Sequence, residues 1–260
     1  MITAGIDVGA KRVKAVILKQ GEVLARSAAS TGLEEEEGIA KAFKEVLRAA
    51  GISREDIVKV VATGMGSRLI DFADETMSIN MADARGAAFL YPSVRTVIDI
   101  GAEGSRVITC ENGRVTAFAV NDRCAAGAGT FIDAMARILE VTPEELGQLA
   151  LKTERSSQIS SQCTVFAESE VVAMVSSESS SEEIARSVVN AIAERTNSLA
   201  RRLNIEPELV LIGGLARNAA FCQALARALE AETLMVPEYP EFVGALGAAI
   251  VAAEKAAEAA

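Results

Sequence analysis

Two short aspartate–glycine segments have the residue types and spacing to bind a phosphorylated ligand. Asp7-Val8-Gly9 and Asp99-Ile100-Gly101 each end an apolar run that is typical of a buried strand. Glycine lets backbone N–H groups approach phosphate oxygens, and a carboxylate can hold Mg²⁺ or its water ligands. The two segments therefore predict a pair of phosphate-binding loops in which Asp7 and Asp99 organise Mg²⁺.

Both segments belong to a repeat with an offset of 92 residues, which also sets Lys14 against Arg106. A predicted β-hairpin follows each loop and turns at Gln20-Gly21 or at Asn112-Gly113. A single Asp-x-Gly is explained by an ordinary turn. Two copies in register favour a duplicated clamp that holds one nucleotide from both sides of a cleft.

The loops supply the first set of predicted nucleotide-binding residues, which are Gly9, Ala10, Lys11, Lys14, Gly101, Ala102 and Glu103. The backbone of the glycines and alanines is expected to hold phosphate oxygens. Lys14 and Arg106 either add positive charge near the γ-phosphate or are solvent-facing hairpin residues. The sequence leaves both interpretations open.

Glycines in the second half of the chain extend this set. An apolar run at 208–212 leads into Gly213-Gly214, where a flat ligand such as adenosine could approach closely, although a plain turn between strand and helix explains the pair equally well. Asn218 either caps the following helix or contacts the ligand. Gly244 opens a run of small residues that fits the nucleotide site and also fits close packing of two helices.

Composition excludes several classes of protein. A net charge of −10 argues against a nucleic-acid partner, and no apolar run reaches the length of about 18–20 residues that spans a bilayer. The chain begins with a predicted strand rather than a signal peptide, so we expect a cytoplasmic protein. It contains no histidine, which excludes Ser-His-Asp and Cys-His catalysis and every histidine-containing metal site.

Helix and strand signals alternate along the chain and predict α/β layers. A helix with an apolar face at 39–50 should stop at Gly51, and a capped turn at 53–56 should lead into a strand at 58–62. A capping box at 142–145 starts a short helix. A long helix should run from Ser181 to about Asn204, and a last helix should begin near Gly244.

Two of the four cysteines lie where a metal cluster could use them. Cys124 follows the second hairpin and Cys163 lies farther on, and each precedes a helical pattern whose positive dipole end favours the thiolate. Such thiolates suit an iron–sulfur cluster, and a two-fold dimer would supply the four that a cubane needs. Ordinary buried cysteines are the alternative, which we apply to Cys110 and Cys222.

The order of these motifs is similar to that of the actin/Hsp70/sugar-kinase superfamily over nearly the whole chain. This resemblance implies an α/β, duplicated ribonuclease H-like ATPase fold with two subdomains around a nucleotide cleft. The subdomains are expected at 1–94 and 95–260, with the last helix (about 244–259) packing back on the first.

Two longer segments carry a more specific resemblance. They are Asn121-Asp-Arg-Cys124-Ala-Ala-Gly127-Ala-Gly129 and Ser160-Ser-Gln-Cys163-Thr-Val-Phe-Ala-Glu168-Ser-Glu170. Both resemble signature segments of the activators (component A) of 2-hydroxyacyl-CoA dehydratases, a family that includes the ATPase subunits of ATP-dependent benzoyl-CoA reductases. Gly127 and Gly129 thereby join the predicted nucleotide-binding residues.

The resemblance implies an ATP-hydrolysing iron–sulfur activator that passes a low-potential electron to an iron–sulfur acyl-CoA dehydratase or reductase. It implies a homodimer, or a heterodimer of paralogues, that shares one [4Fe–4S] cluster through Cys124 and Cys163 and binds ATP or ADP with Mg²⁺ in each subunit. The electron donor would be a ferredoxin or flavodoxin. Asp7, Asp99 and Glu168 are the predicted catalytic residues, and Glu168 either links the nucleotide to the cluster or orients the attacking water.

The chain departs from the activator pattern in both loops. The first has Ala10-Lys11 where activators have a small hydroxyl residue, and the second has Ala102-Glu103-Gly104 in place of Gly-Gln-Asp. The chain mixes features of the dehydratase activators with features of the benzoyl-CoA reductase subunits, so the sequence leaves the partner enzyme open. The alternatives are an amino-sugar type kinase of the same superfamily and a nucleotide-switched, actin-like regulatory protein, and neither gives the two cysteines a role.

Overall fold

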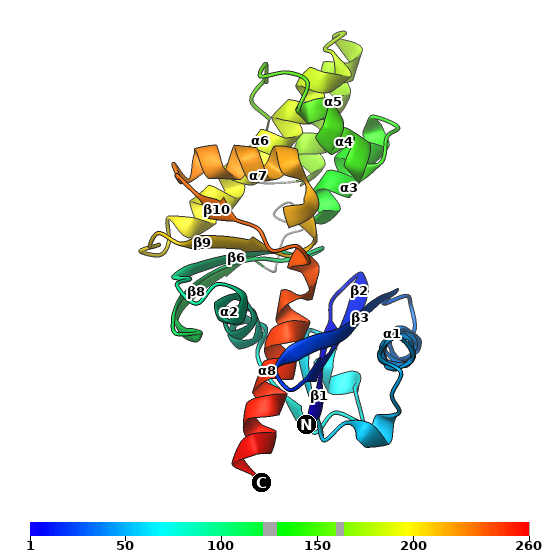
Figure 1. Ribbon diagram of the computed structural model, residues 1–260. Coiled ribbons are helices and arrows are strands. Elements are labelled where there is room, and N and C mark those ends of the chain that lie inside the picture. The colour runs from blue at the N-terminus through cyan, green and yellow to red at the C-terminus, as the bar shows by residue number, and fades with distance from the viewer. Residues whose placement is uncertain (122–128, 160–163, 260) are drawn as a thin grey trace. The chain divides into compact units, whose positions relative to one another are not determined.

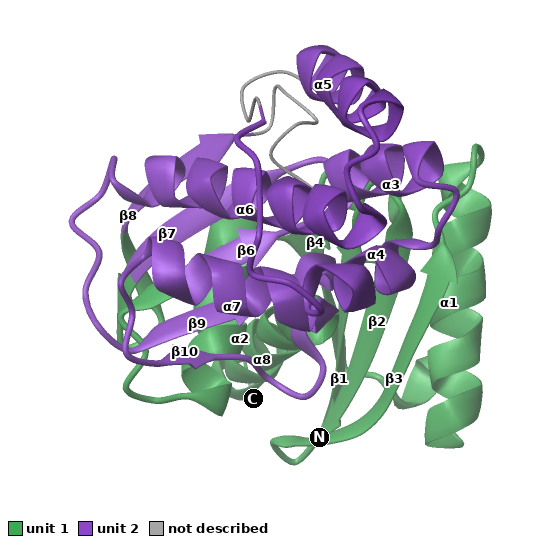
Figure 2. Cartoon of the chain, turned by 90° about the horizontal axis from the view of Figure 1, so that it is seen from above, with its two compact units in different colours: residues 1–97, 110–116, 241–260 green, residues 98–109, 117–240 purple. Residues whose placement is uncertain are grey.

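The computed structural model describes residues 1–121, 129–159 and 164–259. The chain divides into two compact units (Figures 1 and 2). Unit 1 comprises residues 1–97, 110–116 and 241–260, and unit 2 comprises residues 98–109 and 117–240. The final segment of the chain therefore belongs to the same unit as the first strand.

Unit 1 is built on a five-stranded sheet with the order β3-β2-β1-β4-β5. The first three strands are antiparallel neighbours, whereas β4 runs parallel to β1 and β5 runs parallel to β4. The strands are β1 (Ile2–Val8), β2 (Arg12–Lys19), β3 (Glu22–Ser30), β4 (Lys59–Gly64) and β5 (Glu75–Thr76).

Helices cover both faces of this sheet. On one face Ile6 of β1 and its neighbours pack against Phe43 and other apolar residues of α1 (Glu35–Ala50). The other face of β1 meets α8 (Val243–Glu258), where the Thr3 hydroxyl donates to the carbonyl of Ala249 at 3.1 Å. Because side chains alternate along a strand, Asp7 lies on the α8 face with Thr3.

Two glycines let α8 cross α2 (Ile79–Leu90) closely. A β-carbon at Gly247 would lie 1.8 Å from the carbonyl oxygen of Ala82, and one at Gly86 would lie 2.1 Å from that of Val243. Figure 1 shows the two helices side by side. Close helix packing, one of the two interpretations of the small-residue run, is therefore confirmed.

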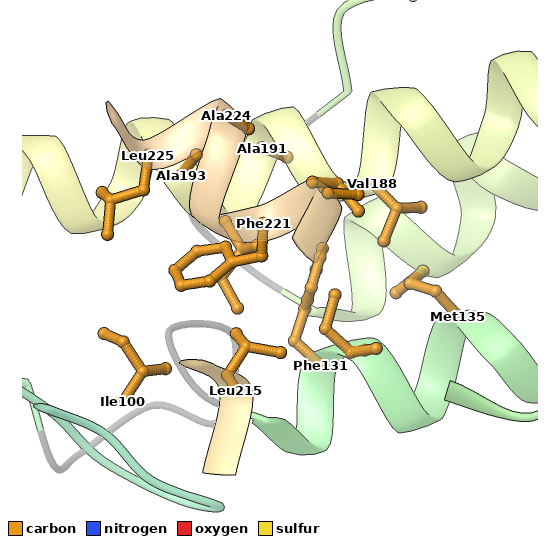
Figure 3. Packing of buried hydrophobic residues seen from close by; sticks show 14 of the residues in the cluster. Ile100, Phe131, Met135, Val188, Ala191, Ala193, Leu215, Phe221, Ala224 and Leu225 are labelled. Atoms are coloured by element: carbon orange, nitrogen blue, oxygen red, sulfur yellow. The ribbon is translucent and has the colours of Figure 1, made fainter. Parts of the chain in front are cut away.

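The second sheet has the order β10-β9-β6-β7-β8. Its strands are β6 (Thr96–Ile100), β7 (Ser105–Glu111), β8 (Arg114–Asn121), β9 (Leu209–Ile212) and β10 (Leu234–Met235). The helices of unit 2 are α3 (Gly129–Ile138), α4 (Pro143–Ala150), α5 (Thr164–Ser176), α6 (Ser181–Ala200) and α7 (Ala219–Ala228). Figure 3 shows its core, in which Ile100, Phe131 and Phe221 pack together.

Most of the predicted element ends are confirmed. Gly51 ends α1 with a left-handed φ of 66°, and the Thr142 hydroxyl and the Glu145 carboxylate form the expected capping box. Both hairpin turns have positive φ at their two central residues, with values of 55° and 85° at Gln20 and Gly21 and of 50° and 72° at Asn112 and Gly113. These values match type I′ turns.

The predicted end of the long helix near Asn204 is wrong. Helix α6 stops at Ala200, because Arg202 and Leu203 donate to carbonyls three residues back, in tighter turns that do not continue the helix. Within the described part of the chain, no helix is both long enough and apolar enough to span a membrane.

Replacing Gly247 by alanine is expected to destabilise the protein, although alanine is ordinarily the better helix former. The added methyl group meets the backbone of α2, and overpacking of this kind costs about 1–3 kcal/mol. Thermal unfolding measures the effect. Gly214→Ala, where a β-carbon would meet nothing within 4 Å, is the matched control. An unchanged melting temperature for Gly247→Ala would contradict the close crossing.

Candidate functional site

Asp7 forms an ion pair near the end of the first strand. Its Oδ2 accepts a hydrogen bond from Lys14 Nζ at 2.8 Å, and both side chains are 16% exposed. The two residues are partners across β1 and β2, and Asp7 is also paired with Thr63 of β4. Lys14 is therefore not the solvent-facing hairpin residue that one interpretation of the sequence allowed.

Gly64 presses the end of β4 against this aspartate. Its φ is 92°, a region that favours glycine, and a β-carbon there would lie 2.6 Å from Asp7 Oδ1 and 2.3 Å from the carbonyl oxygen of Val8. Only glycine fits this position without moving β1.

Further oxygen atoms gather on the α8 face of the sheet. A β-carbon at Gly244 would lie 3.0 Å from Asp83 Oδ1 and 3.8 Å from Asp7 Oδ2, so both carboxylates approach one point. Asp83, on α2, is 3% exposed. The Thr63 hydroxyl is buried and has no hydrogen-bond partner among the described residues. Hard oxygen donors of this kind, with room left by glycine, fit Mg²⁺ and its water ligands.

Unit 2 repeats the arrangement at Asp99. Arg106 Nη1 donates to Asp99 Oδ2 at 2.9 Å, and their side chains are 11% and 12% exposed. Gly213, with a φ of 87°, takes the part of Gly64, since a β-carbon there would lie 2.5 Å from Asp99 Oδ1. The repeat seen in the sequence thus extends to a glycine at the end of a neighbouring strand. As with Lys14, the solvent-facing interpretation of Arg106 is wrong.

Hydrogen bonds hold both Asp-x-Gly loops in shape. In unit 2 the N–H of Gly101 donates to the carbonyl of Gly104, and the N–H groups of Gly129 and Thr130 donate to the carbonyls of Gly101 and Ala102, each at 2.9 Å. The structure therefore brings Gly101, Ala102 and Gly129 together. It also shows that the first two N–H groups of α3 are already occupied.

The loop in unit 1 is tied to the end of β3. The Thr31 hydroxyl donates to the carbonyl of Gly9 at 2.7 Å, and the Thr31 N–H donates to that of Lys11 at 3.0 Å. The remaining predicted loop residues, Ala10, Lys11 and Glu103, have exposed or half-exposed side chains.

Asn218 caps α7, since its Oδ1 accepts a hydrogen bond from the N–H of Phe221 at 3.0 Å. The capping interpretation is confirmed, and a contact with the nucleotide stays a prediction. Gly214 opens a short 3₁₀ turn next to open space. Glu168 is half-buried on α5, and no described hydrogen bond or ion pair joins it to Asp99.

The predicted cluster ligands Cys124 and Cys163, together with Gly127, lie outside the described residues. Of the other two cysteines, Cys110 is buried as predicted, whereas Cys222 is half-buried and packs against the core of unit 2. Burial raises the pKa of the Cys110 thiol and raises that of Cys222 to about 11. Both stay protonated at neutral pH, so neither is suited to be a thiolate ligand.

Sequence reasoning missed Thr63, Gly64, Asp83 and the Ser105 hydroxyl, which is buried without a partner among the described residues. A signal existed for Gly64, because Thr63-Gly64 ends an apolar strand in the way that Ile212-Gly213 does. The predicted strand ended at residue 62 and so stopped short of it. A lone aspartate in an alanine-rich helix offers no such signal, because only tertiary packing brings Asp83 near Asp7.

Known structures resemble this chain throughout its length. Component A of the (R)-2-hydroxyglutaryl-CoA dehydratase of Acidaminococcus fermentans is 41% identical, with a TM-score of 0.96 and 99% of each chain covered. The activator of the 2-hydroxyisocaproyl-CoA dehydratase from Clostridium difficile, solved with bound ADPNP, is 40% identical, with a TM-score of 0.94 and coverage of 100% of this chain and 97% of that one.

Two less similar proteins also match nearly the whole chain. One of the subunits of the benzoyl-CoA reductase of Thauera aromatica is 32% identical over 96% of this chain and 92% of its own. A ROK family glucokinase from Streptomyces griseus shares the fold, with a TM-score of 0.61 at 13% identity and coverage of 98% of this chain and 100% of that one. The predicted α/β fold, which this sugar kinase shares, is therefore confirmed.

The model of the BadF/BadG/BcrA/BcrD ATPase family matches residues 4–252. That range contains both ion-paired aspartates, both glycines that press against them and both cysteine segments. The predicted class of enzyme, an ATPase, agrees with the match, and the chain belongs to the BadF/BadG/BcrA/BcrD ATPase family.

Proposed function

We propose that this chain is an ATP-hydrolysing iron–sulfur activator that delivers a low-potential electron to a partner of the 2-hydroxyacyl-CoA dehydratase or benzoyl-CoA reductase type. The observation that carries the proposal is the matched pair of carboxylate–cation–glycine sites. It occurs in a chain that is 40% identical, over its full length, to a dehydratase activator with bound ADPNP. The partner would be an iron–sulfur acyl-CoA dehydratase or reductase component, and a ferredoxin or flavodoxin in the cytoplasm would reduce the activator.

The two units are proposed to correspond to the two predicted subdomains, and each is proposed to contribute its Asp-x-Gly loop to nucleotide binding. Asp7, with Thr63 and Asp83 near it, would hold Mg²⁺ through its water ligands, and Asp99 would do so from unit 2. Bound there, Mg²⁺ would neutralise charge that develops on the phosphate oxygens.

Hydrolysis joins a water oxygen to the γ-phosphorus and breaks the bond from that phosphorus to the β–γ bridging oxygen. Lys14 and Arg106 already donate to the aspartates, and each can turn a remaining N–H toward phosphate. Asp83 is buried near Asp7 and is proposed to accept a proton from the attacking water. Glu168, which lies on α5 and follows Cys163 in the sequence, is the residue proposed to link the nucleotide to the cluster.

The donor set fits a shared cluster. The chain lacks histidine, and the raised pKa values of the Cys110 and Cys222 thiols disfavour their thiolates, so Cys124 and Cys163 remain as the proposed ligands. Two chains would supply the four thiolates of one [4Fe–4S] cluster, which would carry the transferred electron. A change of nucleotide would then alter the geometry of the dimer through differential contacts with ATP and ADP.

Helix α5 supports the proposed dimer. Most of its residues are apolar, although Glu168 and Glu170 are among them, and only Ala167 and Val171 are buried. Val165 and Phe166 are each 66% exposed, and Val172 and Val175 are also exposed. An apolar surface of this kind, directly after Cys163 in the chain, fits one that a second copy covers.

Asp7→Asn and Asp99→Asn are each expected to lower the Mg²⁺-dependent ATPase rate by roughly 100-fold or more, because each removes a charge that organises the metal and phosphates. Steady-state phosphate production measures the loss. Asp71→Asn, at an exposed position of unit 1, is the control and should retain the parental rate. Full activity in Asp7→Asn would sink the assignment of that carboxylate.

Cys124→Ala and Cys163→Ala are each expected to abolish the cluster. Anaerobically reconstituted parental protein should contain about two irons per chain and absorb as a [4Fe–4S] protein. Cys110→Ala and Cys222→Ala are the matched controls and should keep their iron, since the raised pKa of both thiols makes them poor thiolate ligands. Iron analysis and visible absorption decide the matter. A full complement of iron in Cys163→Ala would rule out its role as a ligand.

The double variant Val165→Ser/Phe166→Ser is expected to weaken dimerisation at least tenfold, because loss of large apolar side chains at an interface commonly costs more than about 1 kcal/mol. Sedimentation velocity across a dilution series measures the dissociation constant. Phe118→Ser, which removes an aromatic side chain that is 56% exposed on β8, is the control. If the double variant dimerised as tightly as the Phe118→Ser control, the proposed α5 interface would be contradicted.

A further inference from the structure

A polar pocket of about 570 Å³ lies in unit 1 beside Gly64. Its walls come from the loop after β4 and from the segment that joins β5 to α2, and none of the described residues that line it is acidic. Because Gly64 also contacts Asp7, the pocket adjoins the proposed phosphate site within the same unit.

Ser67 lines this pocket and has a hydroxyl without a described partner. The residue is only 8% exposed and starts the 3₁₀ turn at Ser67–Leu69. Its hydroxyl forms no hydrogen bond with any residue that the structure describes. A hydroxyl that borders a pocket, in a residue that is otherwise buried and without a partner among the described residues, is available to donate to a ligand there.

Arg68 adds a positive charge to the same wall. Its side chain is exposed and has no ion pair within the described parts of the chain. Guanidinium groups bind phosphate through two parallel N–H donors, which strengthens and orients the contact.

The first turn of α2 supplies further donors. Ser78 is the N-cap and accepts a hydrogen bond from the N–H of Met81 at 3.3 Å, and Ser78 and Ile79 line the pocket. The N–H groups of Ile79 and Asn80 have no acceptor within the helix, so this end of a 12-residue helix favours an anion. Thr76 also lines the pocket.

We propose that this pocket binds orthophosphate, held by Ser67, Arg68 and the N-terminal turn of α2. The inference rests on the proposed ATPase function, since hydrolysis of ATP by water yields ADP, orthophosphate and a proton. The γ-phosphate leaves a site next to Asp7, and Gly64, without a side chain, is the wall that the two sites share. In this proposal, the orthophosphate produced by hydrolysis binds in the pocket before it leaves the protein.

The test is an NMR titration of the full, ¹⁵N-labelled chain with MgADP bound. Sodium orthophosphate should produce saturable amide shifts at residues 67–68 and 78–80, with a dissociation constant in the millimolar range. Sulfate, also a tetrahedral dianion, should compete for the pocket, whereas acetate and chloride at equal ionic strength should not.

Ser67→Ala and Arg68→Gln should each weaken orthophosphate binding roughly tenfold, because each removes a donor to a charged ligand. Arg48→Ala is the matched control. It removes an exposed arginine at the far end of α1, about 20 Å along the helix from Glu35, whose side chain approaches Gly66. Circular dichroism shows that each variant is folded.

Orthophosphate shifts that persist with parental affinity in both variants would overturn the proposal. Acetate binding as tight as orthophosphate binding would also overturn it. Calorimetry with MgADP alone distinguishes failure of the orthophosphate pocket from failure of the proposed ATPase function. A chain that binds MgADP but gives no saturable orthophosphate shifts contradicts the pocket only, whereas a chain that binds no MgADP contradicts the ATPase site itself.

Discussion

Each unit of this protein is organised around an aspartate held between a cation and a glycine. The Asp7–Lys14 and Asp99–Arg106 pairs are largely buried, and the desolvation of such pairs offsets much of their attraction, so stability alone does not account for them. Each pair instead keeps a carboxylate and a cation in fixed positions at the end of a strand. Under the proposed function, a phosphate that reaches either site would meet donors whose orientation is already set.

The aspartates impose strict demands on the backbone around them. Gly64 and Gly213 must have positive φ and no β-carbon, because the carboxylates occupy that space. Gly244 leaves room between Asp7 and Asp83, while Gly247 and Gly86 bring α8 against α2. The close contact between α8 and α2 therefore has two effects. It packs α8 in unit 1, and it brings the carboxylate of Asp83 near that of Asp7.

The surfaces with unused binding capacity are chemically distinct. In unit 1 the pocket beside Gly64 offers a hydroxyl, a guanidinium and a helix N-terminus, which suit an oxyanion. In unit 2 the exposed side of α5 offers valine and phenylalanine, which suit another apolar surface. This division agrees with a protein in which one surface handles the product of hydrolysis and another joins two chains.

The sequence by itself determined the features that depend on neighbours along the chain. The hairpin turns, the helix caps, the buried Cys110 and the paired Asp-x-Gly loops all follow from local backbone preferences and from a repeat with an offset of 92 residues. Only the tertiary structure decided which distant residues complete the site. Asp83 and Gly244 reach Asp7 through the crossing of α2 and α8, and Ser67 lines a pocket that β5 and α2 close. Those contacts join segments far apart in the sequence, and no periodicity or capping pattern records them.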